Sequence, residues 1–198
     1  LRPVARALIQ RAVPYVVEGD GGPSPLSDRR LIRAVNLSLG LRSREATRVA
    51  ALDLHALLFY VPTNAKLIPR GVKKRVREAC KVGESFTRQE LANELGLSTL
   101  LGWIDSEGPI EALIKLRDGT RRYLRALVER HGKVPDPIVR LTSIHGSKGR
   151  EADLVVVIPD MTRATYHEYL HGGQEGREAE NRVFYVAVTR ARQMLVLV

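Results

Sequence analysis

The residues best suited to chemistry lie at positions 142–151, in the segment Thr-Ser-Ile-His-Gly-Ser-Lys-Gly-Arg-Glu. Apolar, β-branched segments at 139–144 and 154–158 flank this polar stretch and predict two buried strands. Loops at strand ends in parallel α/β sheets often bind ligands, because the strands hold the loop while its backbone groups remain unpaired. The segment therefore predicts a site that handles a phosphate or a sugar.

A second group of chemical side chains lies on a predicted helix at 178–191. Its polar stripe has the spacing i, i+4, i+7 and i+11 and consists of Glu178, Arg182, Tyr185 and Thr189. Arg190 lies at the end of this helix, close to the stripe. A guanidinium suits the charge that develops on a transferring phosphoryl group. The alternative is a salt-bridged Arg at a helix C-terminus, which would be structural only.

Both segments resemble motifs of one family, the UvrD/Rep-like superfamily 1 DNA helicases. Residues 142–151 resemble motif V, whose usual form is T-x-H-x-x-K-G-L-E, and residues 178–191 resemble motif VI. Arg150 stands where the family usually has Leu, and Asn181 stands where an Arg is common. The resemblance implies the C-terminal RecA-like lobe of a helicase, an α/β fold with a parallel sheet flanked by helices and a mostly helical insertion.

The resemblance also implies a role for each matching side chain. Arg190 is the implied catalytic residue, an arginine finger that reaches the γ-phosphate of ATP, and Glu151 accepts a hydrogen bond from the ribose. The implied ATP-binding residues are Gly149, Glu151, Arg182 and Arg190, and the implied DNA-binding residues of the loop are Thr142, His145 and Lys148. Arg182 and Tyr185 have the alternative role of organising the cleft.

ATP hydrolysis by the chain alone is not expected. No G-x-x-x-x-G-K-[ST] occurs, and the segment 146–149, Gly-Ser-Lys-Gly, has the wrong spacing for a P-loop. In the family the P-loop and the magnesium-binding carboxylates lie in the N-terminal RecA-like lobe, so ATP and Mg²⁺ are expected to bind mainly there. The implied partners are that lobe of the same protein and single-stranded DNA, along which the enzyme moves 3′ to 5′ by family analogy. Attachment to a nuclease is a further alternative.

The overall charge also favours a polyanionic partner. The 198 residues include 32 Lys and Arg against 22 Asp and Glu, a net charge of +10. Nucleic acid is the first expectation and an anionic membrane surface the second. The single cysteine, the lack of zinc-ligand spacing and the lack of a membrane-spanning segment predict a cytoplasmic protein. The resemblance to DNA helicases implies association with the nucleoid. The first residue is Leu1, which predicts a fragment of a longer protein.

The predicted organisation has three parts. Residues 1–42 and 135–198 are expected to form the RecA-like lobe, and residues 43–134 a reduced helical insertion without a convincing strand. Helices are expected at 2–12 and 25–41, and Ser27 or Asp28 is expected to cap the second. Strands are expected at 13–17 and 194–198. Residues 159–177 are expected to form a polar loop with a short helical piece that ends at Gly172 and Gly173.

Seven basic residues gather between positions 66 and 81 of the insertion, with one acid among them. The functional interpretation is a surface that follows DNA phosphates, with Lys73, Lys74 and Arg75 as DNA-binding residues. The alternative is an ordinary solvated helix face.

Residues 85–104 have the outline of a helix-turn-helix. Ser85 or Thr87 can cap a first helix, Gly96 can take the left-handed turn, and a second helix can begin at Ser98. The second helix is apolar where a recognition helix needs Arg, Asn or Gln. A packing helical hairpin is therefore favoured, and a non-catalytic, helix-turn-helix-like DNA-binding module is the alternative function.

The segment from His167 to His171 matches H-E-x-x-H, the zinc-binding pattern of metalloproteases. No third ligand follows at the required spacing, and two glycines come directly after His171. No metal site is therefore predicted.

Overall fold

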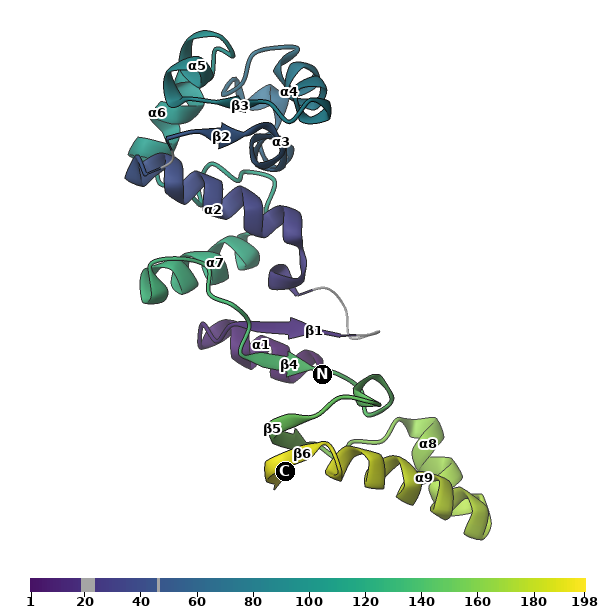
Figure 1. Cartoon of the computed structure of the whole chain (residues 1–198). Coiled ribbons are helices and arrows are strands. Elements are labelled where there is room, and N and C mark those ends of the chain that lie inside the picture. The colour runs from purple at the N-terminus through teal and green to yellow at the C-terminus, as the bar shows by residue number, and fades with distance from the viewer. Residues whose placement is uncertain (19–23, 46) are drawn as a thin grey trace. The chain divides into compact units, whose positions relative to one another are not determined.

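The computed structural model describes residues 1–18, 24–45 and 47–198, which divide into two compact units (Figure 1). The helical unit consists of Arg2–Val16 and 24–140. The C-terminal unit consists of Leu141–Val198, residues 17–18 and Leu1. Two strands, β1 (Tyr15–Val17) and β4 (Val139–Leu141), pair with each other.

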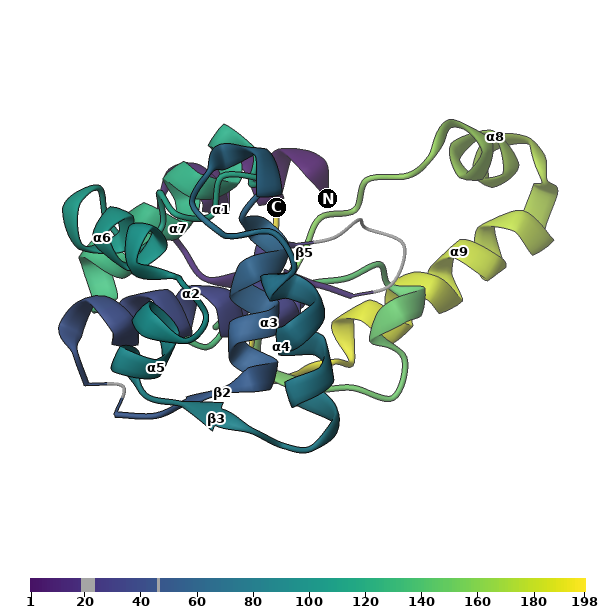
Figure 2. The same ribbon diagram turned by 90° about the horizontal axis from the view of Figure 1, so that it is seen from above.

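The helical unit is built around α3 (Ala51–Tyr60), which lies beside α2 (Arg29–Ser43) and α4 (Val72–Lys81) (Figure 2). Leu54, Leu57 and Leu58 of α3 are buried, as expected for a helix that is apolar on most of its faces. The remaining helices of the unit are α1 (Arg2–Gln10), η2 (Pro25–Ser27), η3 (Thr63–Ala65), α5 (Arg88–Asn93), α6 (Ser98–Ser106) and α7 (Asp118–His131).

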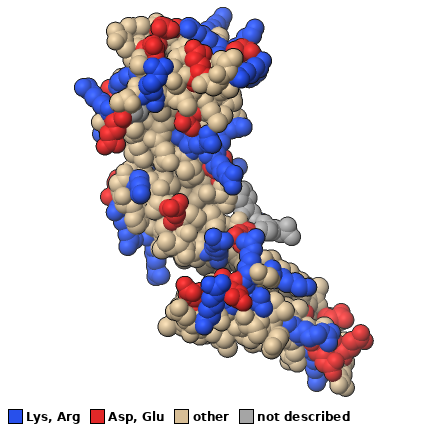
Figure 3. Space-filling model, viewed as in Figure 1, with Lys and Arg blue, Asp and Glu red and all other residues tan. Residues whose placement is uncertain are grey.

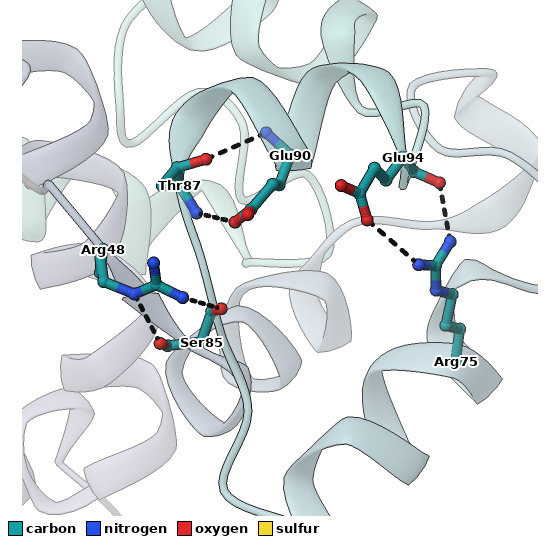
Figure 4. Close-up of polar contacts among 6 residues, drawn as sticks. All are labelled: Arg48, Arg75, Ser85, Thr87, Glu90 and Glu94. Atoms are coloured by element: carbon teal, nitrogen blue, oxygen red, sulfur yellow. Dashed lines mark hydrogen bonds and ion pairs between the residues drawn. The ribbon is translucent and has the colours of Figure 1, made fainter.

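Two short strands cross the region in which no strand was expected. β2 (Val49–Ala50) and β3 (Ser85–Phe86) pair antiparallel, with Val49 opposite Phe86 and both side chains buried. The Arg48 guanidinium donates to the Ser85 hydroxyl at 2.9 Å and to the Ser85 carbonyl at 2.8 Å (Figure 4). The expectation was wrong because two-residue strands are too short to show an alternating pattern in sequence.

Asp28 is the N-cap of α2 and also connects it to α3. One carboxylate oxygen, Oδ1, accepts from the backbone N–H groups of Arg30 and Leu31 at 2.9 and 3.2 Å. The other, Oδ2, accepts from the Tyr60 hydroxyl at 2.6 Å, and burial together with this hydrogen bond raises the pKa of Tyr60. Asp28, one of the two predicted caps, therefore stabilises two helices at once.

The C-terminal unit has a parallel strand pair joined through two helices. β5 (Ala152–Val157) and β6 (Ala191–Leu197) pair in parallel, from Ala152 opposite Ala191 to Val157 opposite Leu197. Along the chain, α8 (Arg163–His171) and α9 (Gly173–Val188) follow β5 and precede β6, and the two helices pack on each other. The short helix η4 (His145–Ser147) precedes β5. The α/β fold class is confirmed, and the described strands form three two-stranded sheets.

Two local predictions for this unit were wrong. The helix α8 ends before Gly172, as expected, but α9 begins at Gly173, five residues earlier than the expected start at 178. The strands are also largely exposed, for example Leu154 at 53% and Met194 at 56%. A two-stranded sheet has few neighbours within the unit to cover its faces, so an apolar sequence did not guarantee burial.

Among the described residues, no helix combines the length and the apolar composition that crossing a membrane requires.

The double role of Asp28 predicts a large effect of its removal. We expect Asp28→Ala to lower the free energy of unfolding by about 2–3 kcal/mol, because the N-cap and the Tyr60 hydrogen bond are lost together. Asp28→Asn keeps a capping oxygen and should lose less. Urea denaturation followed by circular dichroism measures both, with the exposed Asp136→Ala as the matched control. Equal stability of Asp28→Ala and Asp136→Ala would show that the cap does not connect α2 to α3.

Candidate functional site

Arg190 and Glu151 lie next to each other because the two strands that follow them are paired. Glu151 immediately precedes β5, and Arg190 immediately precedes β6. The Ala152 N–H donates to the Arg190 carbonyl at 3.0 Å, and Ala152 stands opposite Ala191. The paired starts of β5 and β6 are visible side by side in Figure 1. The two motif segments therefore meet at the amino ends of one parallel strand pair.

The Arg190 guanidinium lies across the end of α9 and reaches the 142–151 loop. Its Nε donates to the Val186 carbonyl at 2.9 Å, its Nη2 to the Thr189 hydroxyl at 3.0 Å and its Nη1 to the Arg150 carbonyl at 3.4 Å. All three acceptors are uncharged, and within the described part of the chain Arg190 has no carboxylate partner. A guanidinium has five N–H groups, so two remain for an anionic ligand.

Glu151 forms an ion pair with Arg192, whose Nε lies 2.9 Å from Glu151 Oε2. The two side chains are 51% and 61% exposed, so solvent reaches the carboxylate and the bond contributes little to stability. Arg192 was missed by sequence reasoning. Its place two residues after Arg190 was the available signal, since that spacing puts side chains of an extended segment on one face.

A further ion pair, between Arg150 and Glu18, lies beside Glu151. Arg150 is the residue that departs from the usual motif V, and no sequence pattern links it to Glu18, which is 132 positions away. The guanidiniums of Arg150, Arg190 and Arg192 outnumber the carboxylates of Glu18 and Glu151 by one. This cluster therefore keeps a net positive charge, as an anion-binding site requires.

A partly open cavity of about 240 Å³ lies between the loop and α9. Its lining comes from Ile144, His145 and Lys148 of the loop and from Ala179, Arg182, Val183 and Val186 of α9. A more open depression of about 540 Å³ lies along α9 and is lined by Glu178, Asn181, Arg182, Tyr185 and Val186. Arg182 borders both, so the structure brings the predicted ATP residue Arg182 together with the predicted DNA residues His145 and Lys148.

Two glycines give the loop its path. Gly149 has φ of +77°, a left-handed conformation that residues with a Cβ rarely adopt. At Gly146 a Cβ would lie 2.5 Å from the Thr142 hydroxyl oxygen, so the backbone passes close to the half-buried Thr142. The loop is further held by the Gly146 N–H, which donates to the Ser143 hydroxyl at 3.1 Å.

The predicted DNA residues of the helical unit have different surroundings. The Lys73 ammonium donates to the Val61 carbonyl at 2.7 Å at the end of α3, and burial together with the nearby Lys115 lowers the pKa of Lys73. Arg75 donates to the Glu94 carbonyl at 2.8 Å and lies 3.5 Å from its carboxylate (Figure 4). Lys74 is exposed. Lys73 and Arg75 thus have structural partners, whereas Lys74 is directed to solvent. Over the visible face of both units, basic side chains alternate with acidic ones (Figure 3).

The helix-turn-helix outline corresponds to α5 and α6. Thr87 and Glu90 form a capping box at the start of α5 (Figure 4), and Gly96 has φ of +65° between the helices. α6 buries Leu100, Leu101 and Ile104, and its sequence contains no Lys or Arg. The apolar side of α6 is used for packing within the unit, as the helical-hairpin interpretation requires.

The H-E-x-x-H segment lies on α8, where the rings of His167 and His171 are 4.5 Å apart. The part of the chain that the structure describes contains no group of three His, Cys, Asp or Glu side chains arranged to hold a metal ion.

Comparison with known proteins gives two related findings. Residues 104–198 match the family described as the UvrD-like helicase C-terminal domain. Over 194 residues the chain is 28% identical to the ATP-dependent DNA helicase UvrD2 of Mycobacterium tuberculosis (strain H37Rv) and to the protein of the same name from Mycobacterium bovis. The match covers 96% of this chain and 25% of those proteins, so the chain spans about a quarter of the length of the curated relatives it matches.

The left-handed conformation of Gly149 yields a stability prediction for the loop. We expect Gly149→Ala to lower the free energy of unfolding by about 1 kcal/mol, because an L-residue is strained at this φ. Gly149→Asn should lose less, since Asn tolerates the left-handed region. Thermal denaturation measures the change. The control is Gly102→Ala in α6, where the added Cβ meets open space and a gain of up to about 1 kcal/mol is expected. A neutral Gly149→Ala would mean that the loop adopts another path.

Proposed function

We propose that the chain is the C-terminal part of an ATP-dependent DNA helicase that moves along single-stranded DNA, because residues 104–198 match the UvrD-like helicase C-terminal domain. The observation that carries the proposal is the placement of Arg190 and Glu151 at the starts of two paired parallel strands. One cation and one exposed carboxylate side by side suit a nucleotide, which presents phosphates and ribose hydroxyls to its site.

In this proposal Arg190 is the arginine finger. ATP bound mainly by the N-terminal RecA-like lobe of the same protein, with Mg²⁺, would place its γ-phosphate against the two N–H groups of Arg190 that remain. Glu151 would exchange Arg192 for a ribose hydroxyl, a change made easy by the exposure of that ion pair. Gly149 and Arg182 complete the ATP-binding set. The released Arg192 would add to the positive charge near the nucleotide.

DNA contacts are assigned to the other side of the same loop. His145 and Lys148 border the 240 Å³ cavity against α9, and Thr142 lies at the beginning of the loop. Contacts of these residues to the phosphate backbone would not depend on sequence, as a translocating enzyme requires. Because Arg182 lines this cavity too, a shift of α9 when ATP binds would reach the DNA residues directly. Movement 3′ to 5′ is inferred from the family.

Lys74 is proposed as an additional phosphate contact, because it is exposed on α4, while Lys73 and Arg75 hold the neighbouring backbone in place. A helicase of this kind would act in the cytoplasm, on the DNA of the nucleoid.

The finger role predicts a selective loss of catalysis. In the full-length enzyme, Arg190→Ala should lower the kcat of DNA-stimulated ATP hydrolysis by about 10³-fold or more, because the transition-state charge loses its cation. Arg190→Lys should recover little, since an ammonium lacks the planar fork. Phosphate release measures kcat, and oligonucleotide titration measures the dissociation constant for DNA, which should change by less than about threefold.

The matched control is Arg163→Ala, which removes an exposed Arg from the start of α8 in the same unit and should leave kcat unchanged. Thermal denaturation of each variant checks that the end of α9 remains folded without the Val186 hydrogen bond. Equal losses of ATPase activity and DNA affinity in Arg190→Ala would contradict the finger role.

A further inference from the structure

The solvent-facing side of α3 carries an exposed aromatic residue. Leu52, His55 and Phe59 are spaced at i, i+3 and i+7, so they form one stripe along the helix. Leu52 is 52% exposed and Phe59 is 45% exposed, while the opposite side of α3 is buried in the core of the helical unit. Phe59 therefore leaves much of its ring accessible to a ligand on the surface of the unit.

Two cations are held over the Phe59 ring. The Arg30 guanidinium carbon lies 4.5 Å from the ring centroid, and the Lys115 ammonium lies 5.4 Å from it. Both distances are within the range of cation–π attraction. The three residues come from α2, α3 and the segment after α6, so this cluster exists only in the folded unit.

The backbones of both cationic residues are fixed. The Arg30 N–H donates to the capping carboxylate of Asp28 at 2.9 Å, and the Lys115 N–H donates to the Tyr60 carbonyl at 3.0 Å. Tyr60 is the neighbour of Phe59 and bonds the same Asp28. One set of hydrogen bonds therefore positions the backbones that carry the ring and both cations, so less backbone entropy is lost when a ligand binds.

The surroundings of the ring remain positively charged. Burial lowers the pKa of His55, and the charges of Arg30, Arg77 and Lys73 lower it further. Among nearby acids, Asp28 is occupied by the α2 cap and Tyr60, and Asp53 lies 3.4 Å from Arg33. The cations Arg30, Lys73, Arg77 and Lys115 outnumber Asp28, and Asp53 is already paired with Arg33, so the surroundings of Phe59 keep a net positive charge that attracts a polyanion.

We propose that Phe59, Arg30 and Lys115 form a second contact for single-stranded DNA, separate from the 142–151 loop. An unpaired base adds to the stack of the Phe59 ring and the Arg30 guanidinium, and Lys115, with Arg77, binds the adjoining phosphates. Aromatic rings and guanidinium planes accept any base in this way, so the contact is independent of sequence. A base within a duplex is already stacked and does not fit this arrangement. The inference takes its ligand class from the proposed function but depends on other residues.

Replacement of the ring separates stacking from charge attraction. The full-length protein is titrated with a fluorescein-labelled single strand and with an abasic strand of equal length, and anisotropy is recorded. Phe59→Ala and Phe59→Leu should weaken binding of the normal strand by about 5- to 100-fold, the range expected from the loss of one stacked base. Binding of the abasic strand should change by less than about twofold, because its phosphates are intact. Phe59→Tyr should bind like the original protein.

Trp103→Ala is the matched control, because it removes another partly exposed ring, 39% accessible, from α6 of the same unit. It should leave both affinities unchanged. Lys115→Ala should weaken both strands alike and lower the salt dependence of binding by about one phosphate contact. Circular dichroism melts confirm that each variant is folded. If Phe59→Ala fails to fold, the test relies on Phe59→Leu, which keeps an apolar side chain but has no π-face.

Unchanged binding of the normal strand by Phe59→Leu would overturn the inference, as would equal weakening of the normal and abasic strands. Displacement of DNA by an acidic polypeptide with the same efficiency from Phe59→Leu and the original protein would also count against a base-stacking site. A loss of DNA binding confined to Lys148→Ala would refute this second contact but leave the proposed function intact. Conversely, the ATPase result for Arg190→Ala does not depend on Phe59.

Discussion

The hydrogen bond from the Ala152 N–H to the Arg190 carbonyl is the contact on which the C-terminal unit depends. It begins the parallel pairing of β5 with β6, and it does so directly after the two polar motif segments. Because the pairing starts there, a carboxylate and a guanidinium from segments some forty residues apart become neighbours. α9 is held by the same junction, since the Arg190 side chain bonds the last turn of α9 and the loop before β5. The residues proposed to face the nucleotide are thus mechanically connected to those proposed to face DNA.

A comparable constraint organises the helical unit. Asp28 caps α2 and accepts the Tyr60 hydroxyl, which sets α2 and α3 in a definite relation. Their outer side then presents Phe59 beneath Arg30, with Lys115 tied to the same helix end. The buried leucines of α3 supply the hydrophobic stabilisation, while a few hydrogen bonds at its ends determine which cations surround the exposed ring.

Periodicity in the sequence was sufficient for most helices and insufficient for the strands. The caps at Asp28 and Thr87, the left-handed Gly96 and the helix start at Ser98 were all among the predicted alternatives, because capping is a local interaction. The two-residue strands β2 and β3 were not predicted, because their stability comes from a partner about 36 residues away. Likewise, the apolar run of β5 indicated a strand but not its exposure, which depends on neighbours.

The sequence by itself determined the chemical types and order of the motif residues, from Thr142 to Glu151 and from Glu178 to Arg190, and hence the family that residues 104–198 match. Only the tertiary structure decided which partner each charged side chain has. It paired Glu151 with Arg192, turned Lys73 toward the Val61 carbonyl and Arg75 toward Glu94, and placed Arg30 and Lys115 on Phe59. The physical reason is that local spacing specifies the face of a helix or strand, whereas an ion pair or cation–π contact requires two segments to pack at a distance the spacing does not encode.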